Sequence, residues 1–139
     1  MSSLLAGVVS RQPLAVADGR SGSLLERVTL AGDDALLVKH VRDGGDWIMR
    51  ASHDHGRAAE LWSSGVLGRV PEVIDHAVLG AEQVTGGWVV VMRDVSAALV
   101  PDHARISRAD SRRVLEAAAA LHAAFADGPP LRLCPLADR

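Results

Sequence analysis

Short runs of apolar residues, some alternating with polar ones, recur through the first part of the chain. Runs of this length that are bounded by glycine, serine and aspartate are typical of β-strands. They predict three early strands at about 13–17, about 23–30 and about 35–41. The segments DGRSGS (18–23) and AGDD (31–34) supply the turns, and the second is short enough for an antiparallel hairpin. Residues 1–12 are expected to form a loose or short helical lead-in.

Helical spacing appears in the segment HDHGRAAELWSSGVLG (53–68), which predicts a helix. Its apolar residues lie three or four positions apart, at Ala58, Leu61, Trp62 and Val66. Gly65 and Gly68 stand near the predicted end of the helix, and Pro71 stops it. One face of this helix is therefore expected to pack against the strands.

The second half of the chain predicts two further strands and a second helix. The strands are expected at 72–80 and 87–95, with Thr85, Gly86 and Gly87 at the turn between them. A polar connector (96–110) leads to an alanine-rich helix from Ser111 to about Ala126. This order predicts an α+β fold: a five-stranded, mostly antiparallel sheet with one packed helix, followed by the alanine-rich helix.

Composition and charge indicate which partners and which cellular compartment to expect for this chain. The 139 residues carry a net charge of −2, with arginines scattered along the chain, which argues against a nucleic-acid or anionic membrane partner. No apolar run approaches the roughly 20 residues that span a bilayer. No basic residue precedes the apolar stretch of MSSLLAGVVSR, so a secretory signal is not expected. Cys134 is the only cysteine, which favours a cytoplasmic setting.

Lys39 is the only lysine among the 15 lysines and arginines, and it stands in the predicted strand ALLVKHV (35–41). A lysine within a buried strand costs several kcal/mol unless an anion neutralises it. Glu60 is the candidate partner, because it lies on the helix that must pack against this sheet. The alternative is that Lys39 extends from a sheet edge into solvent and that Glu60 faces solvent.

The turn DGRSGS offers Gly19 and Gly22 between the first two predicted strands. Glycines there allow backbone N–H groups to approach phosphate oxygens without a Cβ in the way. The same composition is common in ordinary hairpin turns, so the turn alone leaves both interpretations open.

The order of glycine turn, Lys39 and Glu60 resembles the N-terminal lobe of the protein-kinase-like phosphotransferases. Within that superfamily the chain looks most like the aminoglycoside phosphotransferase and choline kinase-like branch. The segments that carry the resemblance are DGRSGS, RVPEVIDH (69–76), VVVMRDV (89–95), AAALHAAF (118–125) and LCPL (133–136). It covers about residues 13–136.

The resemblance implies a nucleotide site for ATP or GTP with Mg²⁺. Lys39 would hold the α- and β-phosphates, and Glu60 would fix the lysine by an ion pair. The residues implied to cover the phosphates are Gly19, Ser21, Gly22 and Ser23. The residues implied at the adenine are Val28 and Leu37 as walls, Met92 at the back, and the backbone of Met92, Arg93, Asp94 and Val95.

The resemblance also implies a division into a nucleotide-binding N-lobe with its hinge (1–95) and a connector with the first helix of a truncated C-lobe (96–139). The family places its catalytic aspartate and metal ligands after this helix, and the sequence contains no asparagine. The chain alone is therefore expected to be inactive. A complete form would transfer a γ-phosphoryl group to the hydroxyl of a small-molecule substrate.

Two alternatives remain beside this hypothesis. The chain is a non-catalytic nucleotide-sensing or protein-binding module of the same lobe, which would self-associate or bind a partner through an exposed apolar face. Otherwise it is a truncated product without function.

Overall fold

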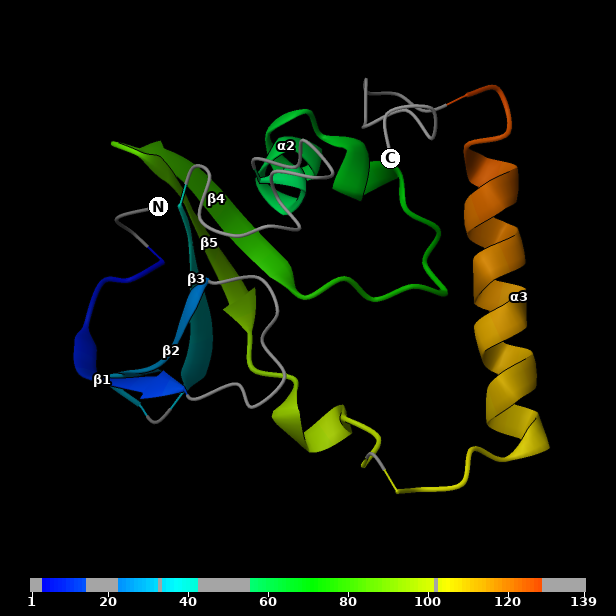
Figure 1. Cartoon of the computed structure of the whole chain (residues 1–139), viewed down its shortest axis with the longest axis horizontal. Coiled ribbons are helices and arrows are strands. Elements are labelled where there is room, and N and C mark those ends of the chain that lie inside the picture. Colours follow the sequence, from blue (N-terminus) through cyan, green and yellow to red (C-terminus); the bar gives the residue numbers. More distant parts are fainter. Residues whose placement is uncertain (1–3, 15–22, 33, 43–55, 102, 129–139) are drawn as a thin grey trace.

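The structure is a computed structural model that describes residues 4–14, 23–32, 34–42, 56–101 and 103–128. Its centre is a five-stranded sheet in the order β1-β2-β3-β5-β4 (Figure 1). The strands are β1 (Val8–Leu14), β2 (Leu24–Leu30), β3 (Ala35–Arg42), β4 (Val78–Val84) and β5 (Gly87–Arg93). Every neighbouring pair is antiparallel, so the predicted α+β fold with an antiparallel sheet is confirmed.

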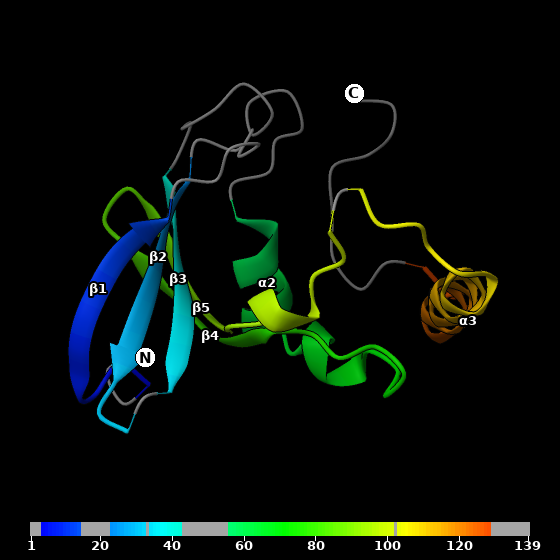
Figure 2. The same ribbon diagram turned by 90° about the horizontal axis from the view of Figure 1, so that it is seen from below.

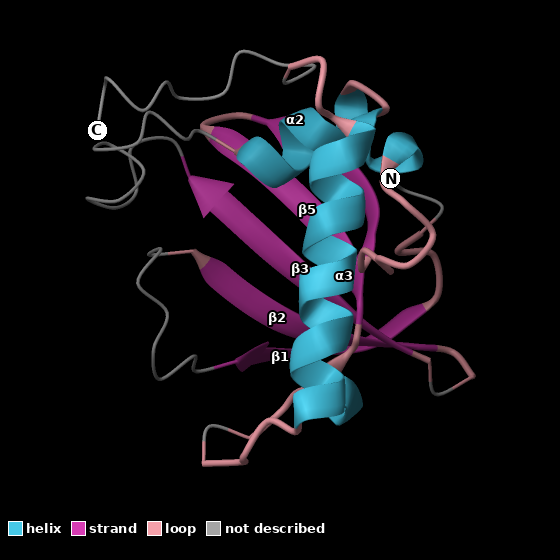
Figure 3. Ribbon diagram, turned by 90° about the vertical axis from the view of Figure 1, so that its right-hand side faces the viewer, coloured by secondary structure: helices cyan, strands magenta, loops and turns pink. Residues whose placement is uncertain are grey.

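The helices of the described residues are α2 (Arg57–Ser63), η1 (Val66–Arg69), η2 (Ser96–Ala98) and α3 (Arg108–Ala124), of which η1 and η2 are short 3₁₀ helices. Figures 2 and 3 show α2 and α3 on the same side of the sheet. The helix α2 packs on β4 and β5, whereas α3 has no buried residue. At the end of α3, the Arg69 guanidinium lies 5.2 Å from the centre of the Phe125 ring, which connects η1 to the segment after the helix.

The register divides the sheet into two faces, because antiparallel partners point to the same side and side chains alternate along each strand. The core face carries the buried cluster of Val28, Leu36, Val38 and Val91. Leu4 and Leu5 pack against this cluster from the N-terminal segment. The opposite face, which we call the helix face, carries the residues that alternate with these along each strand. They include Leu25, Arg27, Leu37, Lys39, Val90 and Met92. Trp88 also belongs to the helix face and lies under Gly56, at the start of α2.

The two edge strands differ from the prediction. β1 begins at Val8, within the expected lead-in, and residues 15–17 lie outside the described residues. β4 begins at Val78 and continues to Val84, whereas a strand was predicted over 72–80. Both strands are mostly exposed or half-buried, so they lack the apolar pattern that marks a buried strand. The turn predicted at Thr85, Gly86 and Gly87 is confirmed, with both glycines at positive φ.

The first predicted helix is shorter than 53–68; of its predicted apolar positions Val66 is buried and Leu61 half-buried, and Ala59 is buried in addition. The hydroxyl of Ser64 donates to the Glu60 carbonyl at 2.7 Å, Gly65 takes a left-handed conformation, and the chain continues as η1. Ala59 is the buried residue of α2, whereas Ala58 and Trp62 are exposed. Residues 53–55 lie outside the described residues.

The helix α3 is confirmed as an element, but it begins before the predicted Ser111. The side chain of Ser107 accepts a hydrogen bond from the Asp110 N–H at 3.1 Å and thereby caps the first turn. Asp110 also places a negative charge in that turn, where the helix dipole favours it.

Candidate functional site

β3 places two of the predicted site residues next to each other on the helix face. Lys39 lies opposite Leu25 of β2 and Val90 of β5. Leu37, two positions earlier, lies opposite Arg27 and Met92. The structure thus brings Lys39, Leu37 and Met92 together in the middle of one face.

The end of β5 forms the segment predicted as a hinge, and Asp94 organises it. One carboxylate oxygen of Asp94 accepts hydrogen bonds from the N–H and the hydroxyl of Ser96. The other lies 2.8 Å from the guanidinium of Arg27, and the side chain of Asp94 is only 9% exposed. The pKa of Asp94 is lowered, first by the hydrogen bond from the Ser96 hydroxyl, then by the Ser96 N–H, with a smaller effect of Arg27. The Asp94 carboxylate therefore links the segment after β5 to Arg27 of β2.

Arg93 and Val95, in the same predicted hinge segment, have contacts of their own. The guanidinium of Arg93 pairs with Asp75 and donates to the carbonyl of His76 at 3.3 Å. The hydrogen bond from Arg93 lowers the pKa of Asp75. The carbonyl of Val95 accepts from the Ala98 N–H at 2.9 Å, at the start of η2. Of the four residues predicted at the hinge, Met92 lies on the helix face, whereas the side chain of Arg93 lies on the core face opposite Leu36.

Val28 does not lie where the prediction put it. It pairs with Leu36, is fully buried and belongs to the core face, so it is on the opposite side of the sheet from Leu37 and Lys39. It therefore cannot line a pocket together with Leu37. Leu25 is the β2 residue that lies opposite Lys39. Sequence reasoning missed Leu25 because the pairing register decides which alternate residues of β2 share a face with Lys39.

The ion pair expected between Lys39 and Glu60 is absent, since no hydrogen bond or ion pair joins these two described residues. Glu60 is exposed on α2, where Ala59 is the residue turned to the sheet. Neighbouring helical residues point about 100° apart, which turns Glu60 away. Lys39 is half-buried rather than buried, so its ammonium needs no protein anion. The alternative placed Lys39 at a sheet edge, but β3 is the central strand; the exposed Glu60 agrees with the second part of that alternative.

Of the four residues predicted to cover the phosphates, the structure describes one, Ser23. Gly19, Ser21 and Gly22 lie outside the described residues. Ser23 is half-buried and directly precedes β2, one strand away from Lys39 in the sheet. The role of this turn stays a prediction.

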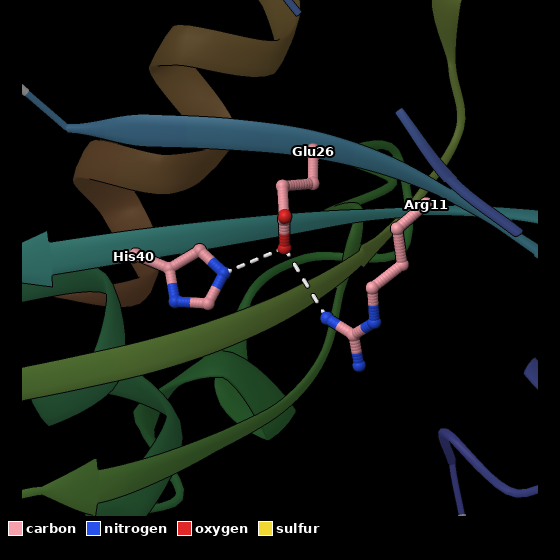
Figure 4. A network of polar contacts seen from close by, with 3 residues as sticks. All are labelled: Arg11, Glu26 and His40. Atoms are coloured by element: carbon pink, nitrogen blue, oxygen red, sulfur yellow. Dashed lines mark hydrogen bonds and ion pairs between the residues drawn. The ribbon is translucent and has the colours of Figure 1, made fainter. Parts of the chain in front are cut away.

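A polar network that the sequence did not indicate lies on the core face (Figure 4). The carboxylate of Glu26 accepts from His40 Nε2 at 2.8 Å and from Arg11 at 3.2 Å. The hydrogen bond from His40 is the main cause of the lowered pKa of Glu26, with the Arg11 charge adding to it. The network joins β1, β2 and β3 on the side opposite Lys39, so it is separate from the predicted nucleotide site.

A partly open pocket of about 210 Å³ lies at the end of the sheet where β4 turns into β5. His40, Arg42, Thr85 and Trp88 are among its lining residues, whereas Lys39, Leu37 and Met92 are not. Within the described ranges, no group of three or more histidine, cysteine, aspartate or glutamate residues is placed to hold a metal ion. Among the described residues, the helix face places the cations Lys39 and Arg27 beside the apolar side chains of Leu37 and Met92, an arrangement that suits the binding of an anionic ligand.

No model of a known protein family, no characterised protein and no solved structure matches the chain. The resemblance to the kinase-like phosphotransferases is therefore still a hypothesis. Among the helices of the described residues, none combines the length and the apolar character needed to cross a membrane.

Proposed function

We propose that this chain is the nucleotide-binding portion of a small-molecule kinase of the aminoglycoside phosphotransferase and choline kinase-like type. The observation that carries the proposal is the register of the helix face, on which Lys39 and Leu37 lie next to Val90 and Met92. This face adjoins α2 and leads into the Asp94 segment. In this proposal residues 1–95 form the nucleotide-binding lobe and 96–139 begin a second lobe.

The proposed nucleotide lies along β3. Its base packs between Leu37 and Met92 near the hinge, and its phosphates lie at Lys39, toward the turn that precedes β2. Two residues of a strand span about 7 Å, which leaves room for the ribose between these ends. The Lys39 ammonium suits phosphate oxygens, because it has no anionic partner among the described residues and is half-exposed.

The proposed metal does not fit the residues present. Mg²⁺ prefers carboxylate oxygens beside the phosphates, and no cluster of potential ligands occurs in the part of the chain that the structure describes. The sequence also contains no asparagine. We therefore propose nucleotide binding for these residues, and γ-phosphoryl transfer to a hydroxyl only for a form that adds the catalytic aspartate and the metal ligands. A cytoplasmic location belongs to the same proposal.

The proposal is tested by calorimetric titration of the chain with Mg·ATP and with adenosine. Lys39→Met is expected to weaken Mg·ATP binding about 10- to 100-fold, because a charge-assisted hydrogen bond to phosphate is lost. Adenosine binding should not change, because it has no phosphate. The matched control is Arg42→Met, which removes a cation of the same strand from the core face. Unchanged Mg·ATP affinity in Lys39→Met would contradict the proposal.

A second candidate function, a non-catalytic module that associates with another copy of itself, is favoured by the exposed apolar side chains after the sheet. These are Leu99, Val100, Ile106, Val114 and Leu115, each at least 63% exposed. Such a surface is typical of a protein interaction site.

Light scattering over a range of concentrations tests this candidate. A mass that rises with concentration, and falls back to the monomer in the double variant Val114→Ser/Leu115→Ser, would support it. A strictly monomeric chain at all concentrations would count against it.

A further inference from the structure

The ion pair between Arg27 and Asp94 lies across the part of the helix face that the proposed base would occupy. Arg27 belongs to β2, Asp94 follows β5, and β3 runs between these two strands. Their side chains meet at 2.8 Å, so they meet over β3. Leu37 is the β3 residue opposite Arg27 and also opposite Met92. The pair therefore passes beside the apolar surface of Leu37 and Met92.

We propose that the Arg27–Asp94 ion pair is a gate over the base-binding end of the helix face. A purine docks against Leu37 and Met92 only when the Arg27 guanidinium has moved away from Asp94. This inference rests on the proposed function. It adds that the Arg27–Asp94 contact competes with the purine base for the same surface.

Opening the pair frees the Oδ2 oxygen of Asp94, which is buried and has no hydrogen-bond partner among the described residues, whereas Oδ1 keeps its own contacts. Asp94 keeps the two hydrogen bonds from Ser96 when Arg27 leaves. The side chain of Arg27 is 50% exposed, so its guanidinium can turn into solvent, where water replaces the carboxylate. An ion pair with one partner this exposed is weak and is screened by salt. The exposed guanidinium weakens the pair, whereas the buried Oδ2 of Asp94 favours the closed arrangement.

The gate lowers the apparent affinity for a base by the fraction of molecules in which it is open. For an ion pair of ordinary strength, removing the pair should raise the affinity by up to about fivefold. The probe is adenosine, because it has no phosphate whose binding would respond to the loss of an arginine charge. Calorimetric titration of the whole chain gives its dissociation constant.

The variants remove the pair from either side. Arg27→Ala removes the cation, and Asp94→Asn removes the negative charge while keeping an oxygen that accepts from Ser96. The matched control is Arg11→Ala, since Arg11 is a 45% exposed arginine that pairs with a carboxylate on the core face. We expect both gate variants to bind adenosine about three- to fivefold more tightly than the wild type, and Arg11→Ala to bind it as the wild type does.

Salt provides a second measurement that needs no substitution. Raising the ionic strength from about 0.05 M to about 0.5 M weakens the pair, so adenosine should bind the wild type more tightly. Adenosine binding by Arg27→Ala should hardly respond to the same change. An affinity that is independent of salt in the wild type would overturn the gate.

The outcomes separate this inference from the function on which it rests. If Arg27→Ala binds adenosine as weakly as the wild type, or more weakly, while Mg·ATP binds the wild type, the gate is wrong and the proposed function stands. If neither the wild type nor any variant binds Mg·ATP or adenosine, the proposed function fails and the gate fails with it.

Discussion

The two faces of β3 are built differently although they alternate along one strand. Leu36 and Val38 on the core face are 8% and 0% exposed, within a cluster that Leu4 and Leu5 cover. Leu37 and Lys39 on the helix face are only half-buried, although α2 packs on the same side over β4 and β5. The difference shows that the helix face is open at Leu37 and Lys39, although Val41 and Val90 on the same face are buried. A single lysine in a central strand is tolerated because the helix face is only half-buried at that position.

The contrast is tested most strongly by shortening one side chain on each face. Val38→Ala should lower the free energy of unfolding by about 2 kcal/mol, because it leaves a cavity in a fully buried cluster. Leu37→Ala removes a larger side chain but should cost about 1 kcal/mol or less, because Leu37 is already partly hydrated. Urea unfolding of the two variants measures both values. Equal losses would show that the two faces are equally packed.

The next largest effect concerns the network of Glu26, Arg11 and His40 on the core face. Because the folded-state pKa of Glu26 lies below its ordinary value of 4.5, its contribution to stability is present above that pH and is lost as the pH falls through the folded pKa. Glu26→Gln should therefore cost about 1 kcal/mol at neutral pH, and the difference from wild type should shrink in acid.

Unfolding measured between about pH 7 and about pH 3 gives this difference directly. Glu82→Gln is the matched control, since Glu82 is exposed on β4 and has no ion pair among the described residues. The control should show neither the loss at neutral pH nor the change in acid. A Glu26→Gln variant as stable as wild type at neutral pH would contradict a structural role for the network.

The smallest effect on stability is expected at Lys39. Lys39→Met should change the free energy of unfolding by no more than about 0.5 kcal/mol, because the ammonium has no protein partner among the described residues and the stem remains. Denaturant titration of the variant checks this expectation. A loss well above about 1 kcal/mol would show that Lys39 supports the fold rather than a ligand.

The central strands were predictable from sequence and the edge strands were not. β2, β3 and β5 pair on both sides, and the predicted strands at 23–30, 35–41 and 87–95 overlap them closely. β1 and β4 have a neighbour on one side only, and their exposed polar residues hide the pattern of a strand. For this reason the sequence predicts a lead-in over part of β1 and a fourth strand that begins before β4.

The candidate site shows what sequence reasoning can and cannot reach. Alternation along β3 was enough to place Leu37 and Lys39 on one face. The face of Val28 depends on the pairing between β2 and β3, and a shift by one residue would have exchanged it with Arg27. The orientation of Glu60 likewise depends on which residue of α2 meets the sheet. Pairing and packing are set by the whole fold, so these two predictions failed.

The central claim is that a nucleotide binds the helix face, and methyl NMR during a titration with Mg·ATP tests it most directly. The account predicts that the methyl signals of Leu25, Leu37 and Met92 shift. The signals of Val28, Val38 and Val91, on the core face of the same strands, should stay in place. Saturating Mg·ATP that moves neither set, or moves the core-face set alone, would contradict the account.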